Sequence, residues 1–298
     1  MTVTTFIEQK FRDYFSTITK EDIIALYHGP DVDGLCSATL VAYAIRQIRG
    51  NGPDLQLWEQ TNVPELSKEN QKKLRNRGVN RLIVLDLSID NAPVETLQII
   101  QTYSTLVLDH HQTTKDINSD AVLFVKPDYF SQIPSSQYPT SKIAYDFLST
   151  FVDLEPLRWV ASMGILSDSA YRSWKSFVDE ATAHFHLKEQ RDIWESELGT
   201  ITKLVSSALL VDPDNSPFCL ELLLQASNPH EILHSQLCRY KKIIDDEITK
   251  QLEQFDTKAK HYPKIGLIFY EISPKYDVTS PVSTILSHRK VPDKTLIV

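Results

Sequence analysis

The sequence predicts an α/β protein built on a doubly wound, mainly parallel sheet. Three short apolar runs, at residues 23–28 (IIALYH), 82–87 (LIVLDL) and 105–110 (TLVLDH), are continuous rather than alternating. This pattern is typical of strands that are buried on both faces of a parallel sheet. Segments with helical spacing separate the runs, so that strand and helix alternate over residues 20–126, as in doubly wound domains.

The helices expected between these strands each carry a local signal. Residues 34–49 place apolar side chains at helical spacing among good helix formers. Residues 67–78 begin at Ser67, a favourable capping residue, and end at Gly78. Residues 92–103 carry a proline in the first turn, where its missing N–H costs nothing.

Further segments complete the expected first domain. Short apolar runs at residues 55–58 (LQLW) and 121–125 (AVLFV) predict two more strands. The first 15 residues mix charged with apolar side chains, which excludes a signal peptide and indicates an amphipathic helix packed on the body.

The second half of the chain is predicted to be mainly helical, followed by a small second α/β unit. Residues 140–260 have helical patterns, whereas residues 264–272, 280–289 and 294–298 read as strand, helix and strand. Because the chain ends inside an apolar strand, we expect this unit to be truncated after Val298. The expected parts are a catalytic domain (1–190), a helical linker (191–260) and the beginning of a substrate-binding domain (261–298).

Composition excludes several classes of protein. The 298 residues carry a net charge of −8, which argues against a broad basic face for long nucleic acids. Walker and dinucleotide-binding fingerprints are absent from the sequence. Cys36, Cys219 and Cys238 form no CxxC pair, so zinc ribbons and a disulfide framework are excluded. No segment approaches the roughly 18 apolar residues of a membrane span, and we expect a cytoplasmic protein without a membrane partner.

Acidic residues follow the expected strands, where ligands bind in an open parallel sheet. Each has an ordinary structural explanation when taken alone: an aspartate such as Asp86 can cap a strand, and paired histidines can lie on the surface. Asp31-Val-Asp33-Gly34 could also open a calcium loop, but Ala42 stands where that loop needs glutamate. Together they form a repeated pattern, which comprises Asp31, Asp33, Asp86, Asp109 with His110 and His111, and Asp168.

Five carboxylates in one crevice require positive charge between them. Each pair about 4 Å apart repels by up to about 4 kcal/mol at an effective dielectric constant of 20. Two divalent cations would compensate this charge, and the mixture of imidazole with carboxylate favours a first-row ion such as manganese. Two such ions activate water for attack on phosphorus, so the predicted reaction is metal-assisted hydrolysis of a phosphoester or phosphoanhydride. A metal-free His/Asp base is the alternative, but it leaves most carboxylates uncompensated.

Four motifs in order resemble those of the DHH phosphoesterase superfamily: HGPDVDG (28–34), LIVLDLS (82–88), VLDHH (107–111) and GILSDSAYR (164–172). The last 32 residues, from Leu267, resemble the start of the DHH-associated substrate-binding domain found in RecJ-type exonucleases and NrnA-like oligonucleotide phosphatases. The resemblance implies a two-metal site that uses Mn²⁺, with Mg²⁺ or Co²⁺ as alternatives.

The resemblance also implies a role for each matched residue. His28 and Asp31 would hold one cation, Asp33, His110 and Asp168 the other, and Asp86 would bridge the two. Asp109 would either bind a metal or orient His110, and His111 would contact the scissile phosphate. Arg172 would clamp a phosphate, or would be an exposed surface arginine.

Two features depart from the family pattern. The spacing between His28 and Asp31 differs from that in many relatives, and the glycine- and histidine-rich motif of the associated domain is absent before Val298. The four tryptophans, Trp58, Trp159, Trp174 and Trp194, are scattered along the chain, and we expect them to be core or packing residues rather than a base-stacking platform.

The predicted function is a manganese-dependent phosphodiesterase, or exonuclease, that releases mononucleotides from single-stranded or short oligonucleotides. Replication or repair proteins are possible partners. A small-molecule phosphatase or pyrophosphatase of the same superfamily is one alternative. The other is an inactive replication scaffold similar to CDC45, which would be expected to have lost its metal ligands.

Overall fold

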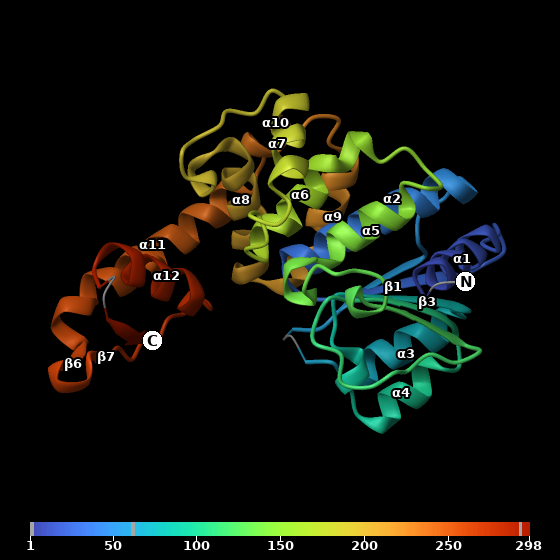
Figure 1. The fold of residues 1–298 in the computed structure, drawn as a ribbon, viewed down its shortest axis with the longest axis horizontal. Coiled ribbons are helices and arrows are strands. Elements are labelled where there is room, and N and C mark those ends of the chain that lie inside the picture. Colours follow the sequence, from blue (N-terminus) through green and yellow to red (C-terminus); the bar gives the residue numbers. More distant parts are fainter. Residues whose placement is uncertain (1–2, 61–62, 292–293) are drawn as a thin grey trace.

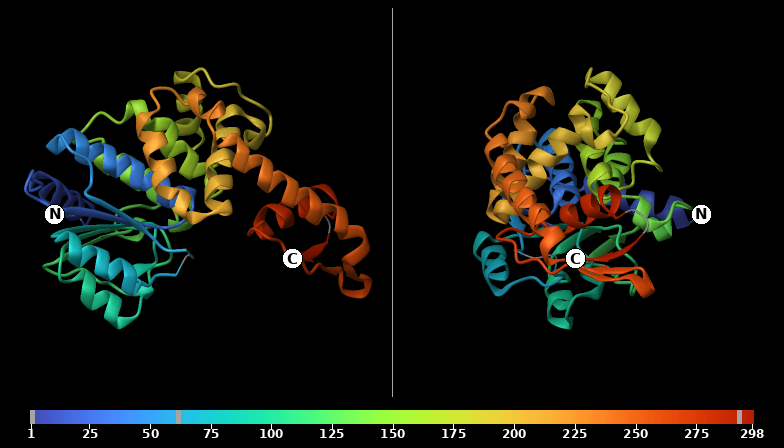
Figure 2. Two further views of the ribbon diagram at one scale, coloured as in Figure 1. Left: turned by 180° about the vertical axis from the view of Figure 1, so that it is seen from behind. Right: turned by 90° about the vertical axis from the view of Figure 1, so that its left-hand side faces the viewer.

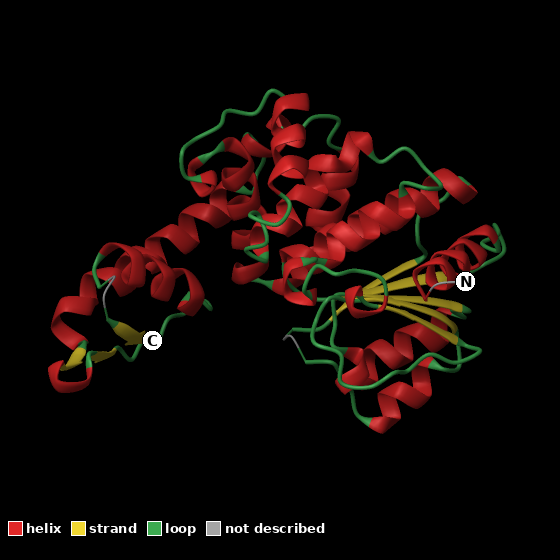
Figure 3. Ribbon diagram, viewed as in Figure 1, coloured by secondary structure: helices red, strands yellow, loops and turns green. Residues whose placement is uncertain are grey.

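A computed structural model describes residues 3–60, 63–291 and 294–298. Its centre is a five-stranded, all-parallel sheet in the order β2-β1-β3-β4-β5. Figure 3 shows the strands as one layer with helices on either side, so the predicted doubly wound α/β fold is confirmed. The strands are β1 (Ile24–His28), β2 (Leu55–Trp58), β3 (Arg81–Leu85), β4 (Ser104–Leu108) and β5 (Val122–Val125).

Residues of β1 point alternately into two cores. Ile24 and Leu26 belong to the larger core, whereas Ala25 and Tyr27 face the smaller one. Helices α3 (Lys68–Arg77) and α4 (Val94–Ile100) lie on one face of the sheet in Figure 1. On the other face lie α1 (Val3–Ser16), α2 (Val32–Arg49), α5 (Thr140–Leu148) and α6 (Arg158–Ser167).

Helix α2 is the centre of the helical layer. Fourteen of its 18 residues are buried, because the sheet lies below it and α5, α6 and α9 pack around it. The remaining helices of this part are α7 (Lys175–His184), α8 (Glu197–Val211), α9 (Ser216–Gln225) and α10 (His230–Leu233). Helices α8 and α9 lie within the segment expected to be a linker, yet their buried residues belong to the same core as those of α2.

The C-terminal unit has its own core. Helix α11 (Cys238–Lys258) extends from α8 to this unit, as Figure 2 shows from behind. A three-stranded sheet, β6 (Lys260–Tyr262), β7 (Leu267–Phe269) and β8 (Thr295–Ile297), packs with α12 (Thr279–Arg289) against the second half of α11. No helix in the described ranges has the length and hydropathy that crossing a membrane requires.

Local signals located several element boundaries correctly. The Oγ of Ser67 accepts a hydrogen bond from Asn70 N at 3.2 Å, and Gly78 ends α3 with φ +71°. Two expected strands end earlier than predicted, at Leu85 and Leu108, and the aspartates that follow are therefore free to turn toward the site. Single-turn 3₁₀ helices connect the elements at Ile89–Asn91, Pro127–Tyr129, Ser135–Gln137, Glu155–Leu157, Ile193–Glu195, Pro213–Asn215 and Pro263–Ile265.

Candidate metal centre

The sheet changes its winding direction at β1. The chain goes from β1 to β2 on one side, and β3 then pairs with β1 on the other side. A crevice opens at the carboxyl ends of the strands at such a switch point. Asp31 and Asp33 lie at the start of α2, directly after β1, and Asp86 follows β3, so the topology brings these acids together.

The backbone at Asp86 has an unusual conformation. Asp86 has φ +57°, a left-handed conformation that is uncommon for a residue with a side chain. Gly29 lies so close that a Cβ atom on it would be 2.5 Å from the Asp86 carbonyl oxygen. The β1 loop and Asp86 therefore approach each other at a distance that only glycine permits, and such local strain is typical of functional sites.

His110 connects two groups of potential metal ligands. Its Nε2 lies 3.0 Å from Asp168 Oδ2 and 3.5 Å from Asp86 Oδ1. The ligand atoms of Asp33, His110 and Asp168 lie within 4.8 Å of one another, as do those of Asp86, His110 and His111. Carboxylate oxygens and imidazole nitrogens at these distances suit divalent first-row cations. These five residues were all predicted from the sequence, and the structure brings them together.

The start of helix α5 holds two of these acids. Thr140 N donates to Asp33 Oδ2 at 2.7 Å, and Ser141 N donates to Asp33 Oδ1 at 3.1 Å. The hydroxyl group of Thr140 donates to Asp86 Oδ1 at 3.0 Å. Unpaired N–H groups at a helix start bind carboxylates well, so α5 fixes the orientation of Asp33. Thr140 and Ser141 were not predicted as site residues, although Pro139-Thr140-Ser141 is a recognisable helix start.

Asp109 contacts His111 rather than His110. Asp109 Oδ1 lies 2.7 Å from His111 Nδ1, and Asp109 Oδ2 lies 2.9 Å from the ammonium group of Lys126. Lys126 is completely buried, is 3.0 Å from Asp90 Oδ1, and donates to the His111 carbonyl oxygen at 2.9 Å. Lys126 and Asp90 were also missed, although a lysine directly after the apolar strand β5 is an unusual signal.

The electrostatics of the metal-free site show an excess of negative charge. Burial and the charges of Asp31 and Asp33 raise the pKa of Asp86 well above its usual value. Burial and the charge of Asp168 raise the pKa of Asp33 to about 7. Burial lowers the pKa of His110, but its contact with Asp168 and the other nearby carboxylates outweigh this effect and raise it to about 9. Buried carboxylates whose pKa values are raised in this way would release their protons to a bound cation, which fits a site built for metal.

His28 and Asp31 lie beside these groups with other partners. Gln56 Nε2 donates to His28 Nε2 at 2.8 Å, and His28 Nδ1 lies 2.6 Å from the Gly29 carbonyl oxygen. Burial lowers the pKa of His28 to about 4, so its ring is neutral. Asp31 Oδ1 accepts from Gly34 N at 3.0 Å and caps α2. His28 is therefore not part of either ligand group in the described residues.

Arg172 is exposed and lines a surface pocket next to Asp168 together with Tyr171 and Trp194. Within the described ranges it makes no ion pair or hydrogen bond.

Trp159 is completely buried in the larger core, as expected. Trp194 is partly buried and packs against the same core.

Comparison with known proteins gives a consistent result for the fold. The family model described as DHH family, N-terminal domain, matches residues 22–165. No curated protein matches the chain in sequence. Similar solved structures include an exonuclease RecJ bound to manganese, at TM-score 0.65 and 14% identity over 95% of this chain and 76% of that chain.

Two further structures share the fold. RecJ from Thermus thermophilus in complex with Mn²⁺ is similar at TM-score 0.67 and 15% identity over 96% of this chain, which spans only 44% of the RecJ chain. The DHH domain of a protein assigned to a family of ribosomal proteins is similar at TM-score 0.72 and 15% identity, over 99% of this chain and 74% of that one.

Proposed function

Residues 22–165 belong to the DHH family, N-terminal domain, and on this basis we propose that the protein is a two-metal phosphodiesterase. It hydrolyses single-stranded or short oligonucleotides to mononucleotides, with Mn²⁺ as its preferred ion. The observation that carries the proposal is the position of His110, which belongs to both groups of potential metal ligands.

Asp33, His110 and Asp168 hold one cation in this proposal. Asp86 provides the connection to the second, with Asp31 beside it, since the charge of Asp31 is the strongest electrostatic influence on the Asp86 pKa. When bound, the two cations supply an activated water molecule and neutralise charge on the phosphoryl oxygens. Manganese is preferred because the ligands combine imidazole with carboxylate. Two solved RecJ structures with this fold contain manganese, and a third contains Mg²⁺.

His111 positions the substrate in this proposal. Its Nδ1 is held by Asp109 at 2.7 Å, and this contact raises the pKa of the imidazole despite partial burial. Its Nε2 has no hydrogen-bond partner among the residues that the structure describes, and about a third of the side chain is exposed. Because Nδ1 faces the Asp109 carboxylate, Nε2 can donate a hydrogen bond to a non-bridging phosphate oxygen when the ring is protonated, which is the form that the raised pKa favours.

The net charge of −8 favours a short substrate. Without a broad basic face, affinity for a long strand through many phosphate contacts would be small. A few contacts near the cations are sufficient for a dinucleotide or a short oligonucleotide.

The test is a hydrolysis panel with a labelled dinucleotide, a longer single strand and inorganic pyrophosphate, each with Mn²⁺ and with chelator. We expect Mn²⁺-dependent release of mononucleotides, which Asp168→Asn abolishes. Asp120→Asn removes the same charge at the opposite end of the sheet and serves as the matched control. Turnover of pyrophosphate alone would identify a pyrophosphatase, and no turnover by the metal-loaded protein would favour a scaffold role.

A further inference from the structure

Beside the metal centre lies a pocket of about 490 Å³ with an aromatic and a cationic wall. We propose that it binds the base of the nucleotide whose phosphate is at the metal centre, with Trp194 as the stacking surface. This inference rests on the proposed function, and names the part of the substrate that the site recognises.

The pocket is directly connected to the ligand groups. Ser169, which lines it, follows Asp168 and turns the chain with φ +58°. Gln137 also lines it, two residues after Ser135, whose carbonyl oxygen is 3.3 Å from His110 Nδ1. A nucleotide with its phosphate near His110 and Asp168 therefore has its base within reach of the pocket.

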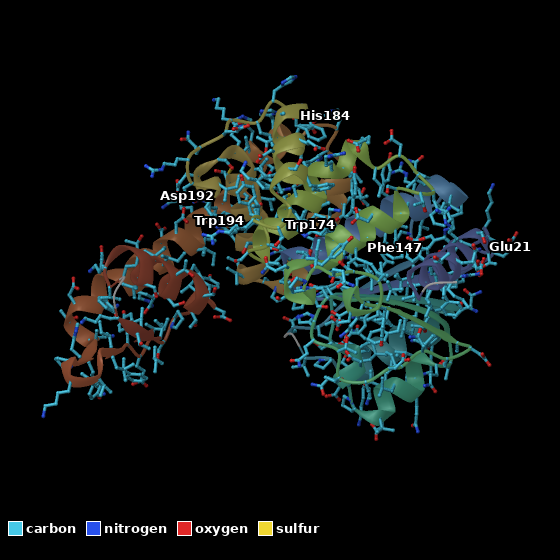
Figure 4. All side chains as sticks on the ribbon, viewed as in Figure 1. Glu21, Phe147, Trp174, His184, Asp192 and Trp194 are labelled. Carbon is cyan, nitrogen blue, oxygen red and sulfur yellow. The ribbon has the colours of Figure 1, made fainter. Side chains whose placement is uncertain are left out.

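The backbone of Trp194 is held firmly in place. It lies in the single-turn helix Ile193–Glu195, where its backbone N–H donates to Asp192 Oδ1 at 3.0 Å. Helix α8 packs so closely behind it that a Cβ atom on Gly199 would be 2.7 Å from Trp194 Cα. In Figure 4 Trp194 and Asp192 lie at the margin of the helical layer on the side of α11. Its Nε1 has no hydrogen-bond partner within the described part of the chain.

The other walls fit a nucleotide. Leu166 and Ile193 supply apolar surface, and Tyr171 supplies a second aromatic ring, which is held by a 3.0 Å hydrogen bond from its hydroxyl group to Asp179. Aromatic faces bind every base, because every base has a π-face. Arg172 contributes a guanidinium group that has no partner among the described residues, and such a group binds phosphate well.

Binding of small probes to the Mn²⁺-loaded full chain tests the proposal without requiring turnover. We expect adenosine monophosphate to bind at least about tenfold more tightly than ribose 5-phosphate, because base stacking on an aromatic side chain has about this effect. Trp194→Ala should reduce the affinity for adenosine monophosphate to that for ribose 5-phosphate, and Trp194→Phe should restore most of it. Arg172→Gln should weaken the binding of adenosine monophosphate but not that of adenosine.

Trp58→Ala is the matched control, because Trp58 is a partly buried tryptophan whose Nε1 is bound to Asp214 at 3.1 Å and which does not line this pocket. Each variant is also checked for its thermal transition and its Mn²⁺ affinity. Equal binding of the two probes by the wild type, or unchanged binding by a folded Trp194→Ala variant, would overturn the proposal.

The same variants separate this inference from the proposed function. Trp194-dependent binding without dinucleotide hydrolysis would support the pocket and refute the phosphodiesterase. Dinucleotide hydrolysis with the same KM in wild type and Trp194→Ala would support the phosphodiesterase and refute the pocket.

Discussion

Lys126 Nζ lies 2.9 Å from Asp109 Oδ2, and both residues are completely buried behind the metal centre. The second oxygen of Asp109 is 2.7 Å from His111 Nδ1, so a fixed positive charge, a carboxylate and an imidazole form a continuous chain. Lys126 compensates two buried carboxylates, those of Asp109 and Asp90. Charge compensation of this kind allows acidic groups to remain ionised in the protein interior.

This arrangement predicts that Asp109 positions His111 and does not bind metal. Asp109→Asn should reduce turnover by about 10- to 100-fold, as is typical when a group that orients a site residue is removed. Mn²⁺ affinity, measured by calorimetry, should remain close to that of the wild type. Asp86→Asn is measured in parallel as a control. It removes the charge of a potential metal ligand and should lose both turnover and Mn²⁺ affinity. A large loss of Mn²⁺ affinity in Asp109→Asn would instead identify Asp109 as a ligand.

Gly164 is predicted to be required for the geometry of Asp33. A Cβ atom at position 164 would lie 2.1 Å from Ser141 Oγ and 2.4 Å from Asp33 Oδ1. Gly164→Ala should therefore destabilise the protein by about 1–3 kcal/mol through overpacking, although alanine is otherwise favoured over glycine in helices. It should also weaken Mn²⁺ binding. Gly52→Ala, where no atom lies within 4 Å of the added Cβ, should change neither. Normal stability and metal affinity in Gly164→Ala would contradict this explanation.

Features of the fold that depend only on neighbouring residues could be predicted from the sequence. Ser67 and Gly78 mark the ends of α3 because capping and a left-handed residue depend on a few neighbouring positions. The acids were also predictable, since a parallel sheet places the ends of its strands at one edge and Asp86 and Asp109 follow strands directly.

The remaining features depend on contacts between distant segments. The partners of Asp33 are Thr140 and Ser141, more than 100 residues away, and Lys126 reaches Asp109 only because β4 and β5 are neighbours. Such contacts have no signature in a single sequence. The same is true of α8 and α9, whose helical patterns did not reveal that they complete the core around α2.

His28 is the matched residue for which the resemblance and the structure differ most. Gln56 and Ser216 hold its Nε2, and its Nδ1 is directed to the Gly29 carbonyl oxygen. We expect His28→Leu to leave Mn²⁺ affinity unchanged and to lower stability by about 1–3 kcal/mol, because buried polar partners lose their hydrogen bonds. His110→Leu, measured in parallel, should lose most of its Mn²⁺ affinity. Equal losses of affinity in the two variants would show that His28 turns to bind a cation, as the resemblance implies.

The final prediction concerns metal removal and pH. In the metal-free protein the pKa of Asp33 is raised from 3.8 to about 7, and that of His110 from 6.5 to about 9. Between pH 4 and 9 the folded chain therefore binds more protons at these groups than the unfolded chain does. The free energy of unfolding must then fall as pH rises through this range. The buried charge of Asp33 does not lower the free energy of unfolding below pH 4, and lowers it fully above pH 7. Protonated His110 raises the free energy of unfolding fully below pH 6.5, and this contribution is lost toward pH 9.

Mn²⁺ replaces these protons, so its stabilising effect should grow with pH. At 100 times its Kd, Mn²⁺ should raise the Tm by roughly 4 °C at pH 8 and by much less at pH 5, where the ligands retain their protons. Scanning calorimetry with Mn²⁺ and with chelator measures both shifts. Asp33→Asn cannot carry the buried charge, so its metal-free form should be more stable than the metal-free wild type at pH 8, while its response to Mn²⁺ should be smaller. An equal Mn²⁺ shift at both pH values would mean that the cation does not compete with protons at Asp33 and His110, and the proposed ligand set would then be wrong.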